Sequence, residues 1–510
     1  MKTEKEIHED LLKGEKIDLE CKEAESQIPK SIYETYSAFA NTNGGTILLG
    51  IREDRKAADP AKRFTVTGIK DKDKLLADFW NTINSSKVNA NILLDEHVYP
   101  LTMGTLTVLV IEVPRADYRI RPVCVGENPF KGSFKRNHEG DYHCTEAEVR
   151  AMIRDENESG NDSLLLEYYS MDDIDLEALH RYRNRFRVVN EENVWNALPD
   201  KEFLEMLGGY RYDRRKKAEG LTMAGLLMFG KGLPIRDVFD LINMDYREET
   251  DVSFDVRWND RITYDGTWEN NLFNYIQRVL PKLTAGLPRP FRMEGVLRED
   301  DTPQHKACRE AVINMVIHAD FQGEGTLKVI RRADRIELTN PGILKIPKEL
   351  IYKGGNSKAR NPKMQTMLRM IGYGDTAGSG FPTILAAWAE KNWPEPELEE
   401  DTVLNQVTLT LRLGSDEEVE LSSETTKETT KKTTEKTTKK TTKKTTKKTT
   451  RETILELLGN DPQTSAKELA NAIGITEDGV RYHLNLLKKN GVIYREGPDK
   501  GGKWVVAKTE

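Results

Sequence analysis

The pattern of hydrophobic and polar positions between Arg309 and His318 predicts a helix with an unusual polar face. Apolar residues recur there at helical spacing, but Glu310, Asn314 and His318 follow one another at intervals of four and therefore share one side. The opposite side can pack against a core. Carboxylate and carboxamide oxygens one turn apart suit Mg²⁺, an ion that proteins commonly bind together with nucleotide phosphates.

Two glycine-bearing turns follow this helix. A strand-like segment leads into Asn-Pro-Gly at residues 340–342, and a second turn contains Gly378 and Gly380. Glycine allows the backbone to approach a flat or anionic group closely. Consecutive N–H groups in such turns form anion-binding nests. The spacing therefore predicts a phosphate site.

The order of these motifs resembles the ATP-binding fold shared by gyrase, histidine kinases and MutL, and more closely its variant in RecG-like bacterial regulators. The resemblance covers about residues 296–412 and implies a GHKL-type α/β sandwich that binds ATP with Mg²⁺. It implies that Glu310 positions water, as in a weak ATPase, and that Asn314 ligates the ion. The other residues that it assigns to the nucleotide are His318, Asn340, Gly342, Gly378 and Gly380.

Alternatives stay open for this segment. An isolated Glu-x-x-x-Asn also fits a packed helix in which Glu310 is a solvated edge charge and Asn314 caps a loop. The three motifs in order favour nucleotide binding, but they do not imply hydrolysis. The His-Arg-Asp-Tyr of the relatives stands here as His-Ala-Asp-Phe at residues 318–321, so one guanidinium expected near the phosphates is missing.

Residues 1–155 alternate between helical and strand-like patterns. A Gly-Gly turn at 44–45 separates a helix from a buried strand, and Thr145 with Glu148 carries a capping-box signature. The predicted helices cover 4–12 and 32–40 with a third that begins at 145, and the predicted strands cover 17–22, 46–51 and 106–114.

Three motifs of this region together resemble the AlbA-like domain related to the Schlafen core, over about residues 8–150. They are the Glu-x-Lys strand at 20–22, the Phe-Ala-Asn-Thr-x-Gly-Gly turn at 39–45 and Gly-Ser-Phe-Lys-Arg at 132–136. The resemblance implies an α+β module that binds RNA or DNA. Some Schlafen relatives are instead RNA nucleases that hold a metal ion with two Glu and one Asp.

The nuclease alternative assigns Glu15 and Glu20 as metal ligands, Glu53 or Asp54 as the third carboxylate and Lys22 as the partner of the scissile phosphate. A metal ion held in this way can activate water and stabilise charge on a phosphodiester. The odd spacing of the two Glu residues would place them on opposite faces of a regular strand. In that case they can simply pair with neighbouring lysines.

The pattern of residues 164–295 predicts a helix-rich bridging region with short strands. Residues 413–450 form a linker built largely on Thr-Thr-Lys-Lys, which cannot bury enough apolar surface to fold and is expected to be disordered. Residues 424–451 carry eleven Lys or Arg and three Glu, whereas the whole chain has a net charge of −7. This tract is therefore either a solvated tether or a basic arm that contacts phosphates.

Residues 451–510 show the order of a winged helix-turn-helix: three helical patterns followed by a hairpin that ends at Trp504-Val505-Val506. The second helix of such a motif enters the major groove of DNA. Lys/Arg and Asp/Glu balance at nine each in this segment, so a protein-interaction role is the alternative. The residues predicted to pack inward are Val480, Leu484 and Leu487, and those predicted to contact DNA are Arg481, Tyr482, Asn485 and Lys488.

The sequence contains no apolar run long enough for a membrane helix and no secretion signal. Its four cysteines form no C-x-x-C pair, as expected for reduced thiols. Cytoplasmic localisation follows as an expectation.

Together these features predict a multidomain protein of mixed α+β and α/β class. The predicted function is a nucleotide-responsive, DNA-binding transcriptional regulator that uses ATP and Mg²⁺, forms a homo-oligomer and contacts no membrane. A metal-dependent RNA or DNA endonuclease, perhaps antiviral, with the ATP-type domain as its sensor, is the alternative. A third hypothesis is an assembly scaffold with a degenerate ATP fold.

Overall fold

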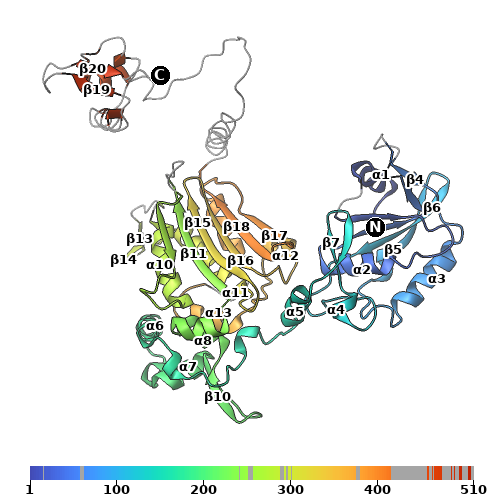
Figure 1. Ribbon diagram of the computed structural model, residues 1–510, viewed down its shortest axis with the longest axis horizontal. Helices are drawn as coiled ribbons and strands as arrows, with labels where there is room; N and C mark the ends of the chain where they lie inside the picture. Colours follow the sequence, from blue (N-terminus) through green and yellow to red (C-terminus); the bar gives the residue numbers. More distant parts are fainter. Residues whose placement is uncertain are drawn as a thin grey trace. The chain divides into compact units, whose positions relative to one another are not determined.

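The computed structural model divides the chain into two compact units, residues 1–427 and 428–510 (Figure 1). In the first unit it describes residues 1–414 except 15–16, 55, 58–62, 241, 251–256, 286, 288–291, 295–296, 300 and 375–379. In the second it describes 457–458, 462, 464–473, 480, 484, 487–488, 493–496 and 503–506. Each unit is described below by itself.

The N-terminal module is built on a four-stranded sheet with strand order β1-β2-β6-β5. Its strands are β1 (Leu19–Lys22), β2 (Gly45–Leu49), β5 (Val98–Met103) and β6 (Leu106–Val113), and α1 (Glu4–Lys13) and α2 (Ile32–Asn41) cover its two faces. β1 and β2 run parallel, and the other neighbours are antiparallel. Because successive residues of a strand point to opposite faces, Ile47 packs with Phe39 of α2 while Leu48 packs with Ile7 of α1.

Smaller elements complete this module. They are β3 (Ile51–Glu53), β4 (Phe64–Val66), α3 (Lys72–Ile83), α4 (Pro129–Gly132), β7 (Phe134–Asn137), β8 (Gly140–His143) and α5 (Glu146–Asp155). The expected capping box begins α5: the Glu148 N–H donates to the Thr145 hydroxyl at 3.3 Å, and the Glu148 carboxylate accepts from the Thr145 N–H at 2.7 Å.

The next segment is helical, as predicted, with one hairpin. It contains α6 (Leu176–Val189), α7 (Asp200–Leu207), β9 (Tyr210–Asp213), β10 (Ala218–Leu221), α8 (Met223–Phe229) and α9 (Gly232–Val238). Its apolar side chains, from Ile174 onward, belong to the same core as those of the sheet that follows, up to Leu411. This segment therefore supports the following fold by direct packing.

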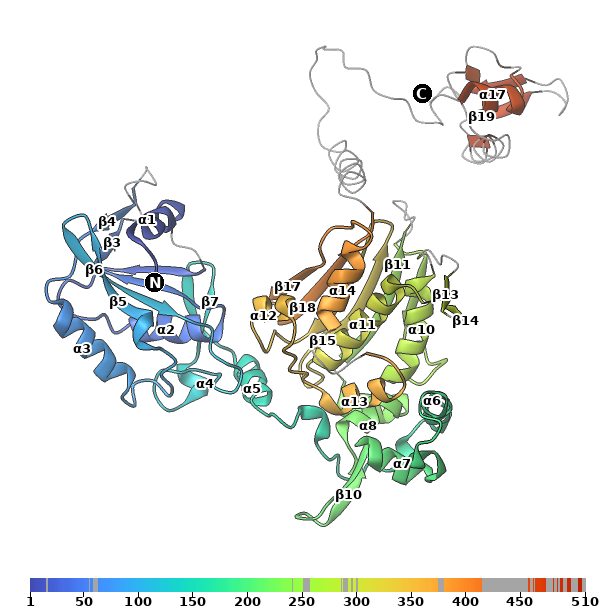
Figure 2. The same cartoon turned by 180° about the vertical axis from the view of Figure 1, so that it is seen from behind.

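A six-stranded sheet with order β12-β11-β15-β16-β18-β17 forms the centre of the following fold. The strands are β11 (Ile242–Glu249), β12 (Asp260–Thr263), β15 (Gly325–Arg332), β16 (Arg335–Pro341), β17 (Glu397–Asp401) and β18 (Gln406–Arg412). Three helices lie on one face of it (Figure 2): α10 (Leu272–Thr284), α11 (Pro303–His318) and α14 (Gly380–Ala389). The remaining elements are β13 (Arg292–Glu294), β14 (Leu297–Glu299), α12 (Lys348–Lys353) and α13 (Pro362–Met370).

This two-layer fold takes in more of the chain than the range 296–412 expected from the motifs. β11 and β12 precede residue 296, yet β11 pairs in parallel with β15 along eight residues. Strand pairing between segments so far apart leaves no periodic signal in either of them. The fold of the sheet therefore begins at β11.

The C-terminal unit contains α17 (Ala466–Ile473) and the hairpin β19 (Ile493–Glu496) with β20 (Lys503–Val506). The inward packing predicted for Val480, Leu484 and Leu487 is confirmed, because all three are buried with Leu469 and Trp504 in one small core. No helix among the described residues is long and apolar enough to cross a membrane.

Candidate functional site

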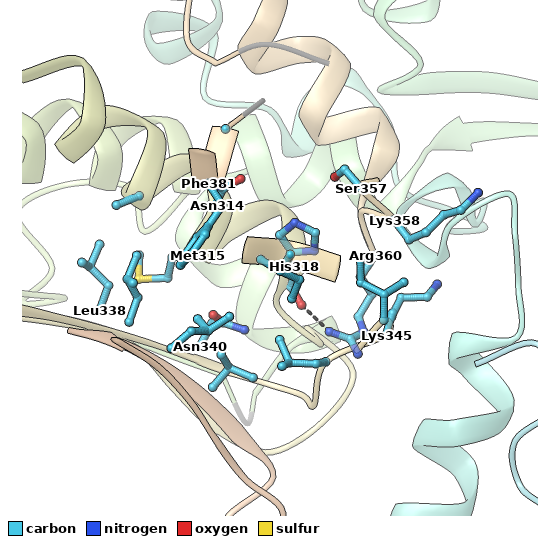
Figure 3. Close-up of a pocket in the computed structure, with 18 of the residues that line it drawn as sticks. Asn314, Met315, His318, Leu338, Asn340, Lys345, Ser357, Lys358, Arg360 and Phe381 are labelled. Atoms are coloured by element: carbon cyan, nitrogen blue, oxygen red, sulfur yellow. Dashed lines mark hydrogen bonds between the residues drawn. The ribbon is translucent and has the colours of Figure 1, made fainter. Parts of the chain in front are cut away.

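A pocket opens between α11 and the strands β16, β18 and β17 of the six-stranded sheet, and its two ends differ in character (Figure 3). Met315 and Leu338 lie at the apolar end, and Ile351, Phe381, Val407 and Leu409 also line the pocket. The other end is cationic and carries Lys345, Lys358 and Arg360 beside His318. Glu310 and Asn314 lie on the wall that α11 contributes, so the structure brings the three predicted helix residues to one site.

α11 begins earlier than the motif suggested. Thr302 caps it by accepting a hydrogen bond from the His305 N–H, and Pro303 occupies its first turn, both of which are ordinary helix-start signals. Glu310 is 9% exposed, Asn314 and His318 are half-buried, and the apolar residues of the helix from Ala307 to Ile317 are buried in the core. The polar face of α11 is thus the wall of the pocket.

Gly380, the first residue of α14, lies against this face. A Cβ atom at Gly380 would be 2.0 Å from Glu310 Oε1 and 3.3 Å from Asn314 Nδ2, so the backbone here passes closer than a side chain permits. Gly374 approaches the other carboxylate oxygen in the same way, with a hypothetical Cβ 3.2 Å away. Gly378 lies outside the described residues. The carboxylate of Glu310 therefore meets Gly374 and Gly380, and the carboxamide of Asn314 meets Gly380.

The Asn-Pro-Gly turn contributes in two ways. Asn340 lines the pocket, where it is 7% exposed and donates to the Pro341 carbonyl at 3.2 Å. Gly342, which has a φ of 95°, is absent from the wall formed by the described residues. Instead it makes room for a side chain, because a Cβ atom at Gly342 would lie 2.8 Å from Arg360 Nη1.

Arg360 and Asn361 hold the C-terminal end of α11. Arg360 donates to the carbonyl of His318, and Asn361 Nδ2 donates to those of Val316 and Ala319 at 3.2 Å and 2.8 Å. The last carbonyls of a helix lack the regular partner four residues on; the carbonyl of Val316 also accepts from the Ala319 N–H at 3.4 Å. Ala319, which stands where the resemblance led us to expect arginine, is fully buried.

Burial and neighbouring positive charges lower the pKa values of two groups at the cationic end. Burial, together with Arg360 and Lys345, lowers the pKa of His318 to about 4, so its imidazole is neutral at neutral pH. Burial, together with Arg360 and Arg121, lowers the pKa of Lys345 to about 8. Desolvation and repulsion between like charges both disfavour the charged form. An anion at this end would relieve that repulsion.

Sequence reasoning missed Lys345 and Lys358, and it gave Arg360 no role. The two lysines lie on irregular segments, where no periodicity points to a function. The only available signal was the Arg-Asn-Pro motif at 360–362.

In the N-terminal module Glu20 is engaged in ion pairs. Lys22 Nζ lies 2.6 Å from its Oε1, and Arg136 Nη2 lies 2.9 Å from its Oε2. Asp54 accepts from the Lys56 N–H at 2.9 Å. Within the part of the chain that the structure describes, no three His, Cys, Asp or Glu side chains gather as a metal site. Glu15 falls outside that part, so the carboxylate triad stays a prediction.

Of the residues predicted to contact DNA, Lys488 is exposed. Arg481, Tyr482 and Asn485 lie outside the described residues.

Family models match four segments of the chain. Residues 15–145 match "Schlafen, AlbA_2", residues 150–245 match a domain of unknown function, residues 325–411 match "Putative ATP-dependent DNA helicase recG C-terminal", and residues 448–494 match "Winged helix-turn-helix DNA-binding". These matches confirm the expected architecture: a Schlafen/AlbA module, an ATPase-type domain and a winged-helix DNA-binding domain. The third match begins after α11, so Glu310 and Asn314 lie outside it.

Solved structures also match. The crystal structure of the DIP2311 protein from Corynebacterium diphtheriae is 17% identical over 98% of this chain and 83% of that chain, with a TM-score of 0.38. The solution structure of the N-terminal domain of a RecG-related protein from Nitrosomonas europaea is 27% identical over 28% of this chain and 95% of that chain, with a TM-score of 0.23. No curated protein sequence matches the chain.

Proposed function

We propose that this chain is a nucleotide-responsive, DNA-binding transcriptional regulator, in which ATP and Mg²⁺ bind the pocket beside α11 and control engagement of nucleic acid. One observation carries the proposal: the pocket joins an apolar end to a cationic end, with Glu310 and Asn314 on the wall formed by α11. A nucleoside triphosphate has the same division between a flat base and a charged tail.

The two ends suit the two parts of ATP. Apolar and aromatic walls bind flat rings, while a few polar groups fix their orientation; Phe381 and Asn340 supply these features. The phosphate tail would reach Lys345 and Arg360. Arginine presents a planar fork of donors that matches phosphate oxygens, and lysine adds a compact charge.

The donor set of α11 fits a hard divalent ion. Asn314 offers a carboxamide oxygen, and the Glu310 carboxylate one turn earlier would hold a water molecule beside it. When bound, Mg²⁺ neutralises phosphate charge. Gly374 and Gly380 confine the Glu310 carboxylate by their close backbone approach. This confinement keeps the water-positioning group in one place.

The winged helix supplies the contact with DNA, and its match to a DNA-binding family supports this part of the proposal. ATP can control that contact only if it binds one arrangement of the protein better than another. Binding of Mg-ATP should therefore change DNA affinity.

We expect Mg-ATP to shift the affinity of the full chain for duplex DNA by at least about fivefold, the lower range for coupled sites. Fluorescence anisotropy at fixed salt measures this shift, because phosphate contacts make any affinity depend on salt. Adenosine, which lacks phosphates, is the control and should have no effect. Calorimetry that detects no binding of Mg-ATP would overturn the proposal, as would binding that leaves DNA affinity unchanged.

ATP affinity should also fall as pH rises through about 8. The protonated form of Lys345 favours phosphate, and its pKa of about 8 means that this form is lost above that pH. One proton linked to binding weakens affinity by up to about tenfold per pH unit. Calorimetry between pH 7.5 and 9.5 measures the slope. The variant Lys345→Gln should bind more weakly at pH 7.5 and show a flatter profile, and an equally steep profile would exclude Lys345 as its source.

A further inference from the structure

Arg360, at the cationic end of the pocket, is held by a carboxylate from the N-terminal module. Its Nε and Nη2 atoms donate to the two carboxylate oxygens of Asp155 at 2.6 Å and 2.7 Å, and both side chains are buried. Asp155 is the last residue of α5 and lies 205 positions away in the chain. A guanidinium suited to phosphate is therefore already engaged in a bidentate pair.

A second ion pair joins α5 to the same place. Arg154 Nη2 lies 2.7 Å from Asp320 Oδ2, and Asp320 is the second residue after the end of α11. Arg360 itself donates to the carbonyl of His318, the last residue of α11, and to that of Ile343 at 2.8 Å. A movement of the Arg360 side chain would therefore alter its hydrogen bonds to the pocket wall and to α5 at the same time.

The surroundings carry more positive than negative charge. Arg115 pairs with Glu400 at 2.7 Å, but Arg121 is 2% exposed and no hydrogen-bond partner among the described residues reaches its Nε or Nη1. Burial, together with Arg115, lowers the pKa of Arg121 to about 10. With Lys345, Lys358, the Arg360–Asp155 pair and the Arg154–Asp320 pair included, six cations share three carboxylates. This surplus favours an additional anion.

A phosphate at this end would compete directly with Asp155. Arg360 can offer its fork of donors to a carboxylate or to a phosphate. The phosphate would also repel the Asp155 carboxylate, because like charges at short range in a buried site disfavour each other.

We infer that the Asp155–Arg360 pair couples the nucleotide pocket to the N-terminal module: the phosphates of a nucleoside triphosphate draw Arg360 from Asp155 and loosen α5 from the end of α11. The inference rests on the proposed function, because it needs a triphosphate in that pocket. The coupling is reciprocal by thermodynamic necessity. A ligand of the N-terminal module that loosens α5 strengthens ATP binding by the same factor.

Calorimetry with Mg-ATP on the full chain tests the competition. Asp155→Asn keeps the shape of the side chain but removes its charge, and we expect it to bind Mg-ATP about tenfold more tightly than the wild type. Its affinity for adenosine should not change. The matched control is Glu146→Gln, which removes an exposed carboxylate from the same helix. Unchanged or weaker ATP affinity in Asp155→Asn would overturn the inference.

Amide hydrogen exchange of the wild-type chain tests the coupling without any variant. Exchange in α5 should become faster when saturating Mg-ATP is added, and adenosine should leave it unchanged. If Mg-ATP binds but exchange in α5 stays the same, the inference fails while the proposed function stands. If Mg-ATP does not bind to the wild type, both fail.

Discussion

Replacing Asn314 with alanine will weaken the binding of Mg-ATP by about 100-fold or more, since loss of even an outer-shell partner of a metal site costs 10–100-fold. Asn314 lines the pocket one turn after Glu310, and in the proposed function its carboxamide oxygen ligates the ion. Alanine keeps the helix, because it has the highest helix propensity. Calorimetry with Mg-ATP measures the loss.

Two controls distinguish the loss of a metal ligand from a change in the fold. Asn243→Ala removes an exposed carboxamide from β11, away from the pocket, and should bind Mg-ATP as the wild type does. With a chelator in place of Mg²⁺, the wild type and Asn314→Ala should bind ATP equally weakly. If Asn314→Ala bound Mg-ATP with wild-type affinity, its assignment as the metal ligand would be wrong.

The variant Arg136→Met should lower the free energy of unfolding of the N-terminal module by about 3–5 kcal/mol, the usual cost of breaking a buried ion pair by removing one partner. Arg136 is 2% exposed and lies 2.9 Å from both Glu20 Oε2 and Asp141 Oδ1. It also donates to the Leu19 carbonyl at 3.0 Å. Methionine fills much of the space but leaves two carboxylates without this partner.

Amide exchange in β1, β2 and β6 during urea unfolding reports on this module separately from the rest of the chain. The matched control is Arg52→Met, which removes an exposed arginine paired with Glu23 and should leave exchange unchanged. Equal effects of the two variants would show that burial of Arg136 does not decide its contribution.

Local signals predicted much of the fold. The helix start at Thr145, the inward face of Val480, Leu484 and Leu487, and the polar face of α11 all depend on residues within a few positions of one another. Periodicity and capping express such short-range geometry directly. The domain architecture followed from motifs that resemble known families.

The site was only partly predictable for the same reason. The spacing of Glu310 and Asn314 is local, and it placed both on one wall of the pocket. Lys345 and Lys358 belong to irregular segments, and their role depends on where the chain turns after β16. No pattern around them distinguishes a pocket cation from a surface charge.

The sequence by itself determined the helices that begin near residues 4, 32 and 145, the cap at Thr145 and the polar face of α11, because each is set by neighbours a few residues away. The tertiary structure decided which distant parts of the chain meet: the charges of Asp155 and Arg360, the charges of Glu20 and Arg136, and the strands β11 and β15. Those pairings follow from the path of the whole chain and from the burial of charges that can be tolerated only with a partner. The sequence of a single segment shows neither the path of the whole chain nor the partner of a buried charge.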